Sequence, residues 1–226
     1  MIDNRYYHPI SAVYCKIQEF LKTRGFDMFD TSDVSTIESN FDVVDVPNIH
    51  PARRYEDIFF LNEGFILSKH YSSMQYEIML KNTLPIKAMY FGKAYRNIKS
   101  SYEADNVTYQ FEGFSIGRNC GLATLFGLIS DVLDVLEIDN KYIIMSKFFP
   151  YAEPGYCVQY QEKYLGDRFA ESTKRINLCS CGIIHPNLLK KAHIDTSEYI
   201  GISFCFNVSQ LARIIFKIED VRMMHE

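Results

Sequence analysis

Long apolar runs are absent from this 226-residue chain: no stretch reaches the roughly 18 residues that a membrane helix needs. A positively charged segment ahead of an apolar run is also absent at the N-terminus, so we expect no secretory leader. An excess of basic residues is missing too, because 24 Lys and Arg face 28 Asp and Glu, which argues against tRNA as a partner. The six cysteines are scattered, and we expect a reduced, cytoplasmic protein.

The chain does contain enough apolar sequence for a substantial core. Its composition, 47% hydrophobic and 23% charged, predicts a single domain over residues 1–226. One helix followed by many strands, interrupted by single helices, favours an α+β fold in which helices pack on a mostly antiparallel sheet. The polar segment 159–174 is predicted to be a loop. Predicted helices are 11–24, 74–81, 122–136 and 208–216, and predicted strands are 58–61, 65–67, 86–95, 107–116, 142–146, 175–184 and 199–206.

Seven groups of residues follow one another along nearly the whole chain in an order that carries a family resemblance. They resemble the catalytic core of the phenylalanyl-tRNA synthetase alpha chain, a class II aminoacyl-tRNA synthetase. The resemblance implies a class II synthetase-like antiparallel sheet flanked by helices, and a homodimer, although Ser32 stands at the proline of the first class II motif. The groups are Asn40-Phe41-Asp42 with Pro47 and His50-Pro51-Ala52-Arg53; His70-Tyr71-Ser72 with Met74-Gln75; Gly92-Lys93-Ala94-Tyr95-Arg96; Tyr109-Gln110-Phe111-Glu112-Gly113; Phe149-Pro150-Tyr151 with Glu153-Pro154; Cys181-Gly182 with His185-Pro186; and Asp220-Val221-Arg222.

The resemblance also implies an amino-acid pocket. Gln110 and Glu112 are two residues apart on a predicted strand, so their side chains face the same side and can converge on one ligand. The alternative interpretation is that Glu112 is a surface carboxylate and Phe149 an ordinary core residue. The substrate-binding residues that the resemblance implies are His70, Ser72, Tyr109, Gln110, Glu112, Phe149, Tyr151 and Ser203.

Three of these positions make the pocket more polar than the family pattern. Tyr151 replaces a phenylalanine, Tyr109 a histidine, and Ser203 a small apolar residue. A buried hydroxyl without a partner costs roughly 1 to 3 kcal/mol, so each hydroxyl should have a protein or ligand partner. Either Ser203 bonds the backbone and the tyrosine hydroxyls reach water, or the preferred ligand is no longer phenylalanine.

The nucleotide side departs much further from the family. Arg96 matches the arginine expected to hold the α-phosphate and the amino-acid carboxylate, and it is the candidate catalytic residue. Four positions that normally contact the rest of ATP have changed. Arg213, one helical turn beyond the last of them, is the alternative residue that could supply the charge lost at Gln210. The four changed positions are Ile98, Ala104, Thr108 and Gln210.

Cys179, Cys181, His185 and Cys205 have metal-ligating side chains, but two of these positions are family features, and we expect no metal.

The leading hypothesis is a divergent, free-standing paralogue that binds an amino acid or related small molecule without efficient tRNA charging. The first alternative is an enzyme that activates an amino acid with ATP and Mg²⁺, and the second is a structural dimerisation module.

Overall fold

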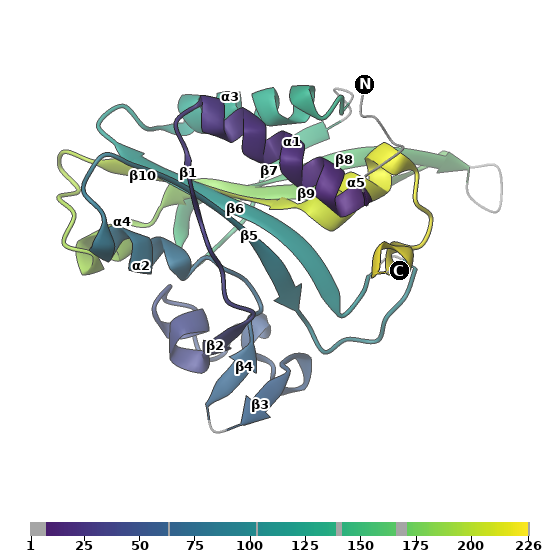
Figure 1. Ribbon diagram of the computed structural model, residues 1–226, viewed down its shortest axis with the longest axis horizontal. Helices are drawn as coiled ribbons and strands as arrows, with labels where there is room; N and C mark the ends of the chain where they lie inside the picture. The colour runs from purple at the N-terminus through teal and green to yellow at the C-terminus, as the bar shows by residue number, and fades with distance from the viewer. Residues whose placement is uncertain (1–7, 63, 103, 139–141, 166–170, 226) are drawn as a thin grey trace.

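A seven-stranded sheet forms the centre of the molecule in a computed structural model that describes residues 8–62, 64–102, 104–138, 142–165 and 171–225 (Figure 1). Only the pair β1–β5 is parallel; every other neighbouring pair is antiparallel. The prediction of an α+β fold with a mostly antiparallel sheet is confirmed. In sheet order the strands are β1 (Asp27–Phe29), β5 (Ile86–Tyr95), β6 (Val107–Gly117), β10 (Ile200–Asn207), β9 (Glu171–Ile184), β8 (Ala152–Leu165) and β7 (Tyr142–Ser146).

Two layers cover the two faces of this sheet. The helices α1 (Pro9–Thr23), α3 (Leu122–Val135) and α5 (Val208–Phe216) lie together on one face (Figure 1). The shorter helices α2 (Met74–Lys81) and α4 (Pro186–Lys191) and a three-stranded sheet lie on the other. Strand β6 supplies side chains to both cores, because Phe111 packs under the helix layer and Phe114 packs on the opposite face. The small sheet has the order β2 (Val34–Thr36), β4 (Phe65–Leu67), β3 (Phe60–Asn62).

Helix α1 shows why the sequence prediction succeeds where periodicity is strong. Val13, Ile17 and Leu21 are 0% exposed and recur every four residues, so one face of the helix is buried against the sheet. Gly25 has φ +80°, a conformation that favours glycine, and it follows the helix end directly. The predicted helix 11–24 is confirmed to within two residues at its start.

The predicted loop 159–174 is wrong for most of its length. Strand β8 continues to Leu165 and β9 begins at Glu171, with Gln161 opposite Arg175 in the antiparallel ladder. Residues 166–170 lie outside the described residues. A projecting two-stranded ribbon satisfies its backbone hydrogen bonds across the ladder and needs little apolar surface, so a polar composition does not exclude strands.

Close backbone packing beneath β8 and β9 gives a stability prediction. A Cβ added at Gly182 would lie 2.6 Å from the backbone oxygen of Pro154, whereas a Cβ at Gly127 on α3 would meet no atom within 4 Å. We expect Gly182→Ala to lower the free energy of unfolding by roughly 1 to 3 kcal/mol, because backbone must shift. Gly127→Ala should raise it by about 0.5 to 1 kcal/mol through helix propensity. Urea unfolding of both variants checks this, and a neutral Gly182→Ala would contradict it.

Candidate functional site

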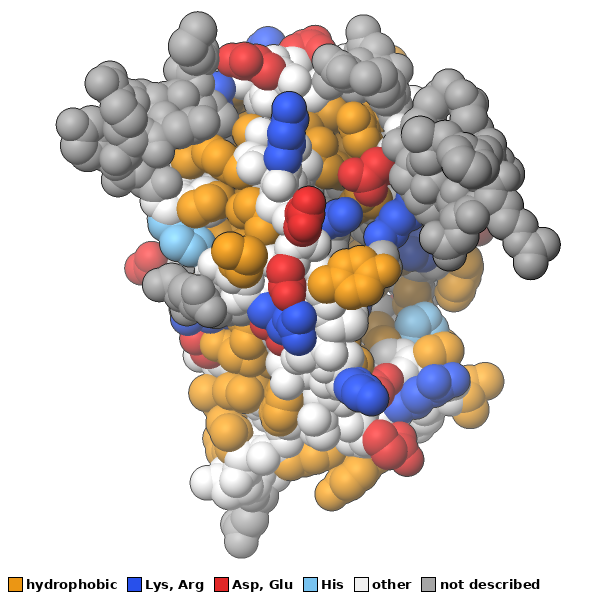
Figure 2. All heavy atoms as spheres, turned by 90° about the vertical axis from the view of Figure 1, so that its right-hand side faces the viewer, with side chains coloured by type: hydrophobic (Ala, Val, Ile, Leu, Met, Phe, Trp, Pro, Cys, Tyr) orange, Lys and Arg blue, Asp and Glu red, His pale blue; other side chains and the backbone are white. Residues whose placement is uncertain are grey.

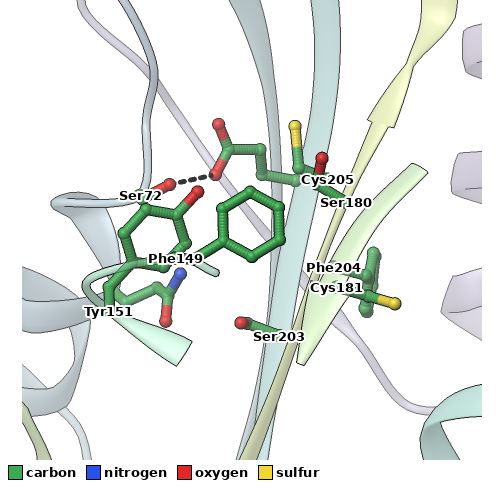
Figure 3. A pocket seen from close by; sticks show the side chains of 10 residues that line it. Ser72, Phe149, Tyr151, Ser180, Cys181, Ser203, Phe204 and Cys205 are labelled. Atoms are coloured by element: carbon green, nitrogen blue, oxygen red, sulfur yellow. Dashed lines mark hydrogen bonds between the residues drawn. The ribbon is translucent and has the colours of Figure 1, made fainter. Parts of the chain in front are cut away.

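A pocket on the α2 side of the sheet is floored by side chains from three adjacent strands. Glu112 of β6 stands opposite Cys205 of β10, and Cys205 stands opposite Ser180 of β9. The cavity volume of the pocket, counted as the space open to the centre of a water molecule, is about 10 Å³, so a ligand larger than water requires the wall of the pocket to move outward. We call this site the Glu112 pocket. Its lining residues are Ser72, Gln75, Glu112, Phe149, Tyr151, Ser180, Cys181, Ser203, Phe204 and Cys205 (Figure 3).

Glu112 is a buried carboxylate that accepts hydrogen bonds from the segment at Tyr71 and Ser72 and from Cys205. The exposed fraction of Glu112 is 1%, which rules out the alternative that it is a surface residue. The Tyr71 amide donates to Oε1 at 3.0 Å, and the Ser72 hydroxyl donates to Oε2 at 3.2 Å (Figure 3). Burial raises the pKa of Glu112 to about 7, against the lowering effect of these hydrogen bonds. A carboxylate kept ionised only in part near neutral pH suits a site that a cationic group completes.

Two aromatic rings form the wall that faces this floor. The Phe149 and Tyr151 rings stack with centroids 5.6 Å apart and planes 26° apart (Figure 3). His70 stacks on the far side of Tyr151, at 6.5 Å. Burial raises the pKa of the Tyr151 hydroxyl, and the neighbouring Glu112 charge adds to the effect. Phe149 therefore lines the pocket rather than the core, which makes the wall a slot for an apolar or aromatic group.

Several buried polar atoms around the pocket have no hydrogen-bond partner among the described residues. They include Gln75 Oε1 and Gln110 Oε1, on side chains that are 2% and 8% exposed, and His70 Nδ1. Burial, together with the nearby positive charge of Arg96, lowers the pKa of His70 to about 4, so the ring is neutral at physiological pH. Buried acceptors without partners are rare in folded proteins and cost free energy, so their concentration here indicates a ligand site.

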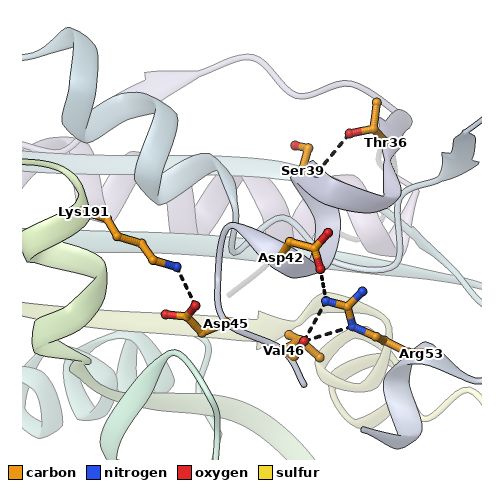
Figure 4. A network of polar contacts seen from close by, with 7 residues as sticks. All are labelled: Thr36, Ser39, Asp42, Asp45, Val46, Arg53 and Lys191. Atoms are coloured by element: carbon orange, nitrogen blue, oxygen red, sulfur yellow. Dashed lines mark hydrogen bonds and ion pairs between the residues drawn. The ribbon is translucent and has the colours of Figure 1, made fainter. Parts of the chain in front are cut away.

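The first motif of the sequence supports the pocket from behind instead of lining it. Asn40 accepts from the Lys69 amide at 3.3 Å and donates to the His70 carbonyl at 2.9 Å, which fixes the backbone next to Ser72. Arg53 donates to the Val46 carbonyl at 2.7 Å and pairs with Asp42 (Figure 4). These residues hold the segment that carries His70 and Ser72.

A second cleft, with a cavity volume of about 170 Å³ on the same measure, lies further along β6. We call it the Arg96 cleft. The structure brings together here Arg96 and all four positions that depart from the family pattern on the nucleotide side. One wall is the loop after β5, in which Asn106 accepts from the Ile98 amide at 3.2 Å. The lining residues are Arg96, Ile98, Ala104, Asp105, Val107, Thr108, Asn207, Ser209, Gln210 and Val221.

Arg213 does not join this cleft. It lies 3.6 Å from Glu162 of β8 and is absent from the cleft lining, so the structure gives no support to its replacing the lost charge at Gln210.

Five of the eight predicted substrate residues line the Glu112 pocket, His70 and Gln110 lie beside it without lining it, and Tyr109 faces the other side of the sheet. The Tyr109 ring stacks on Phe91 at 5.9 Å under the helix layer, on the face of β6 opposite Gln110 and Glu112. Alternation along a strand requires this, because residues 109 and 110 cannot face the same side of a regular strand. Among the described residues, no three His, Cys, Asp or Glu side chains gather as metal ligands.

Five lining residues were not in the predicted set: Gln75, Ser180, Cys181, Phe204 and Cys205. Cys205 was recognisable from the sequence, because it lies two residues after Ser203 on the same strand and shares its face. Ser180 is brought in by its pairing with Cys205, which no local pattern reveals.

Comparison with known proteins agrees with this geometry. The family described as tRNA synthetases class II core domain (F) matches residues 1–226. The chain belongs to this family. It is 30% identical over 224 residues to the phenylalanine--tRNA ligase alpha subunit of Christiangramia forsetii, and 30% identical over 225 residues to that of Francisella tularensis, covering 97% of this chain in each case. The chain spans 66% of the length of both relatives.

Among solved structures, the class II core seen here also occurs in pyrrolysyl-tRNA synthetase from Desulfitobacterium hafniense. The TM-score is 0.71, the identity is 17%, and the match covers 98% of this chain and 75% of the other. This likeness concerns the fold.

No helix in the described ranges is long and apolar enough to cross a membrane.

Proposed function

We propose that this class II core binds an amino acid, or a close analogue of one, in the Glu112 pocket and does not charge tRNA efficiently. The observation that carries the proposal is the presence of two buried acceptors, Glu112 and Gln75 Oε1, in the lining of one pocket beside an aromatic slot. An α-ammonium has three N–H donors, so one such group can donate to both acceptors. The slot between Phe149 and the strands then receives the side chain.

Arg96 supplies the opposite pole of the ligand. It lines the neighbouring cleft, and its charge acts on His70 and Tyr151 at the edge of the Glu112 pocket. A carboxylate lying toward Arg96 while the ammonium lies at Glu112 gives a zwitterion both of its partners.

The Arg96 cleft supports the second half of the proposal. Ile98, Thr108 and Gln210 are uncharged, and Asp105 places a carboxylate in the same lining as Arg96. A triphosphate needs several cationic or metal partners, which this lining does not provide. The face drawn in Figure 2 likewise intersperses basic, acidic and apolar side chains, which gives no extended basic surface for tRNA.

Retention of Arg96 in an open cleft is the observation that favours the enzymatic alternative. On that alternative, the chain activates an amino acid with ATP and Mg²⁺ and passes it to tRNA with a partner, as the name of its relatives suggests, or to another acceptor. A homodimer remains part of either proposal. The burial of Glu112 in a pocket argues against a purely structural module.

Calorimetric titration with the standard amino acids tests the proposal. At least one should bind, and its affinity should be about tenfold higher at pH 8 than at pH 6, because Glu112, with a pKa of about 7, must ionise to pair with the ammonium. The sign follows from charge: protonated Glu112 offers the ammonium no countercharge. Absence of any binder at millimolar concentration would overturn the proposal.

The polar groups of the slot predict an altered selectivity. Ser203 is 4% exposed and lines the pocket with Tyr151, so a ligand with a polar side chain should bind better than phenylalanine. We expect the double variant Ser203→Ala, Tyr151→Phe to shift the ratio of affinities toward phenylalanine by roughly tenfold. Phe149→Tyr, which adds a hydroxyl on the same wall, is the matched control and should shift it the other way. An unchanged ratio in the double variant would show that these hydroxyls do not face the ligand.

A further inference from the structure

The Glu112 pocket and the Arg96 cleft follow one another along two paired strands, and we call the two together the track. Thr108, Gln110 and Glu112 share one face of β6, with Thr108 in the cleft and Glu112 in the pocket. On β10, Asn207 stands opposite Gln110 and lines the cleft, while Cys205 stands opposite Glu112 and lines the pocket. A ligand held at Glu112 can therefore extend along the strands, past Gln110, toward the cleft.

The track has the length and chemistry of a short peptide. Residues two apart on a strand are about 7 Å apart, so two residues of extended chain that begin at Glu112 end near Gln110 and the opposite Asn207, where the cleft begins. Beyond Arg96 the cleft presents hydroxyl and amide groups, among them Asn207 and Ser209. In the described part of the chain, the lining contains one cation, Arg96, and one carboxylate, Asp105, so the formal charge of the lining is zero. Such a surface matches the amide groups of a peptide better than a polyanion.

Gln110 is the residue that points independently to a ligand at the junction. Its side chain is 8% exposed, and its Oε1 atom has no partner among the described residues. It lies between the pocket and the cleft, where a ligand with an N–H donor can satisfy it.

We infer that the track binds the N-terminal residue of a short peptide or of an aminoacyl amide, with the first residue in the Glu112 pocket and the second in the Arg96 cleft. This inference rests on the proposed function, because the same Glu112 pocket holds the ammonium. It adds that the ligand extends beyond its first carboxyl group and that the cleft receives a neutral polar chain instead of a nucleotide.

Calorimetry with paired ligands tests the inference. The probes are the standard amino acids and the corresponding dipeptides X-Gly, each with and without millimolar ATP, and the N-acetylated form of the best-binding dipeptide. We expect that dipeptide to bind at least tenfold more tightly than its free amino acid, acetylation to abolish binding, and ATP to change neither affinity.

Two variants in the loop after β5 test whether the higher affinity of the dipeptide comes from the Arg96 cleft. Ala104→Trp places an indole in the Arg96 cleft and should reduce the ratio of dipeptide to amino-acid affinity to about one. Tyr102→Trp, on the same loop but 58% exposed and outside the cleft lining, should keep the ratio of the unmodified protein.

The outcomes separate the two claims. Binding of free amino acids without any gain from the added glycine, or a gain that Ala104→Trp leaves intact, would overturn the inference and leave the proposed function standing. Competition of ATP with the dipeptide, or stronger amino-acid binding in the presence of ATP, would also overturn it. If neither an amino acid nor a dipeptide binds, both claims fail.

Discussion

Exchange of pyrophosphate into ATP, driven by any amino acid, is expected to be undetectable or at least about a thousandfold slower than in a competent synthetase core. Roughly 4 kcal/mol of lost transition-state stabilisation gives that factor. Each lost charge-assisted contact costs roughly 1.5 to 3 kcal/mol, and Ile98, Ala104, Thr108 and Gln210 all line the cleft where those contacts would form. The measurement is a radiolabelled exchange assay with a phenylalanine--tRNA ligase as the positive control.

A single reversion should not restore exchange. Gln210→Arg returns one charge to the cleft, but Ile98 and Thr108 remain uncharged and Asp105 remains as a carboxylate. Brisk exchange by the unmodified protein would sink the binding proposal and favour the activating enzyme. Exchange recovered by Gln210→Arg alone would show that the other changed positions contribute little.

Substitution Glu112→Gln is expected to have effects of opposite sign on binding and on stability. Ligand affinity should fall by roughly 1.5 to 3 kcal/mol, the scale of a charged hydrogen bond. Stability should rise at pH 8, because the unmodified protein must then keep an ionised carboxylate buried at 1% exposure. A conservative surface control is Glu77→Gln on α2, whose carboxylate is 55% exposed in an ion pair with Lys81.

The direction of the pH effect follows from the pKa of Glu112. That pKa is about 7 in the folded chain, against 4.5 for an ordinary solvated glutamate, so the folded state holds the proton more tightly than the unfolded state. The stabilising contribution of the protonated group is complete below pH 4.5 and is lost as the pH rises to 7. The advantage of Gln should therefore grow over this window, to an upper value of about 3 kcal/mol. A variant that is equally destabilised at pH 5 and pH 8 would contradict a raised pKa.

The sequence predicts those parts of the fold in which a local period decides the structure. Helix α1 and strands β5, β6 and β10 follow from apolar spacing. Strand β8 escaped prediction because Pro154 and Gly155 lie near its start and its far half is polar. Its strand conformation is decided by pairing with β9, a contact between residues distant in sequence.

Some features of the candidate site also follow from a local pattern, and others depend on contacts between distant residues. The side on which Glu112 lies follows from alternation with Gln110, and the same rule assigns Tyr109 to the opposite face. That Glu112 is buried, with its carboxylate fixed by Tyr71 and Ser72, depends on a segment some 40 residues earlier in the chain. A periodic sequence pattern does not reveal such a contact, so the raised pKa of Glu112 could not be predicted from the sequence.

The two sides of the Glu112 pocket come from parts of the chain with different constraints. Its floor belongs to three paired strands, where a single extra methyl group at Gly182 would meet backbone. Its wall, in contrast, comes from the short connection at Phe149–Ala152, where the Ala152 amide donates to the Phe149 carbonyl at 3.3 Å and the His185 amide donates to the Tyr151 carbonyl at 2.9 Å. Mutations in that connection can change the shape of the slot while the sheet keeps its register. Ligand preference can therefore change between relatives while the sheet stays the same. Wall residues such as Tyr151 are the positions at which we expect relatives with different ligands to differ.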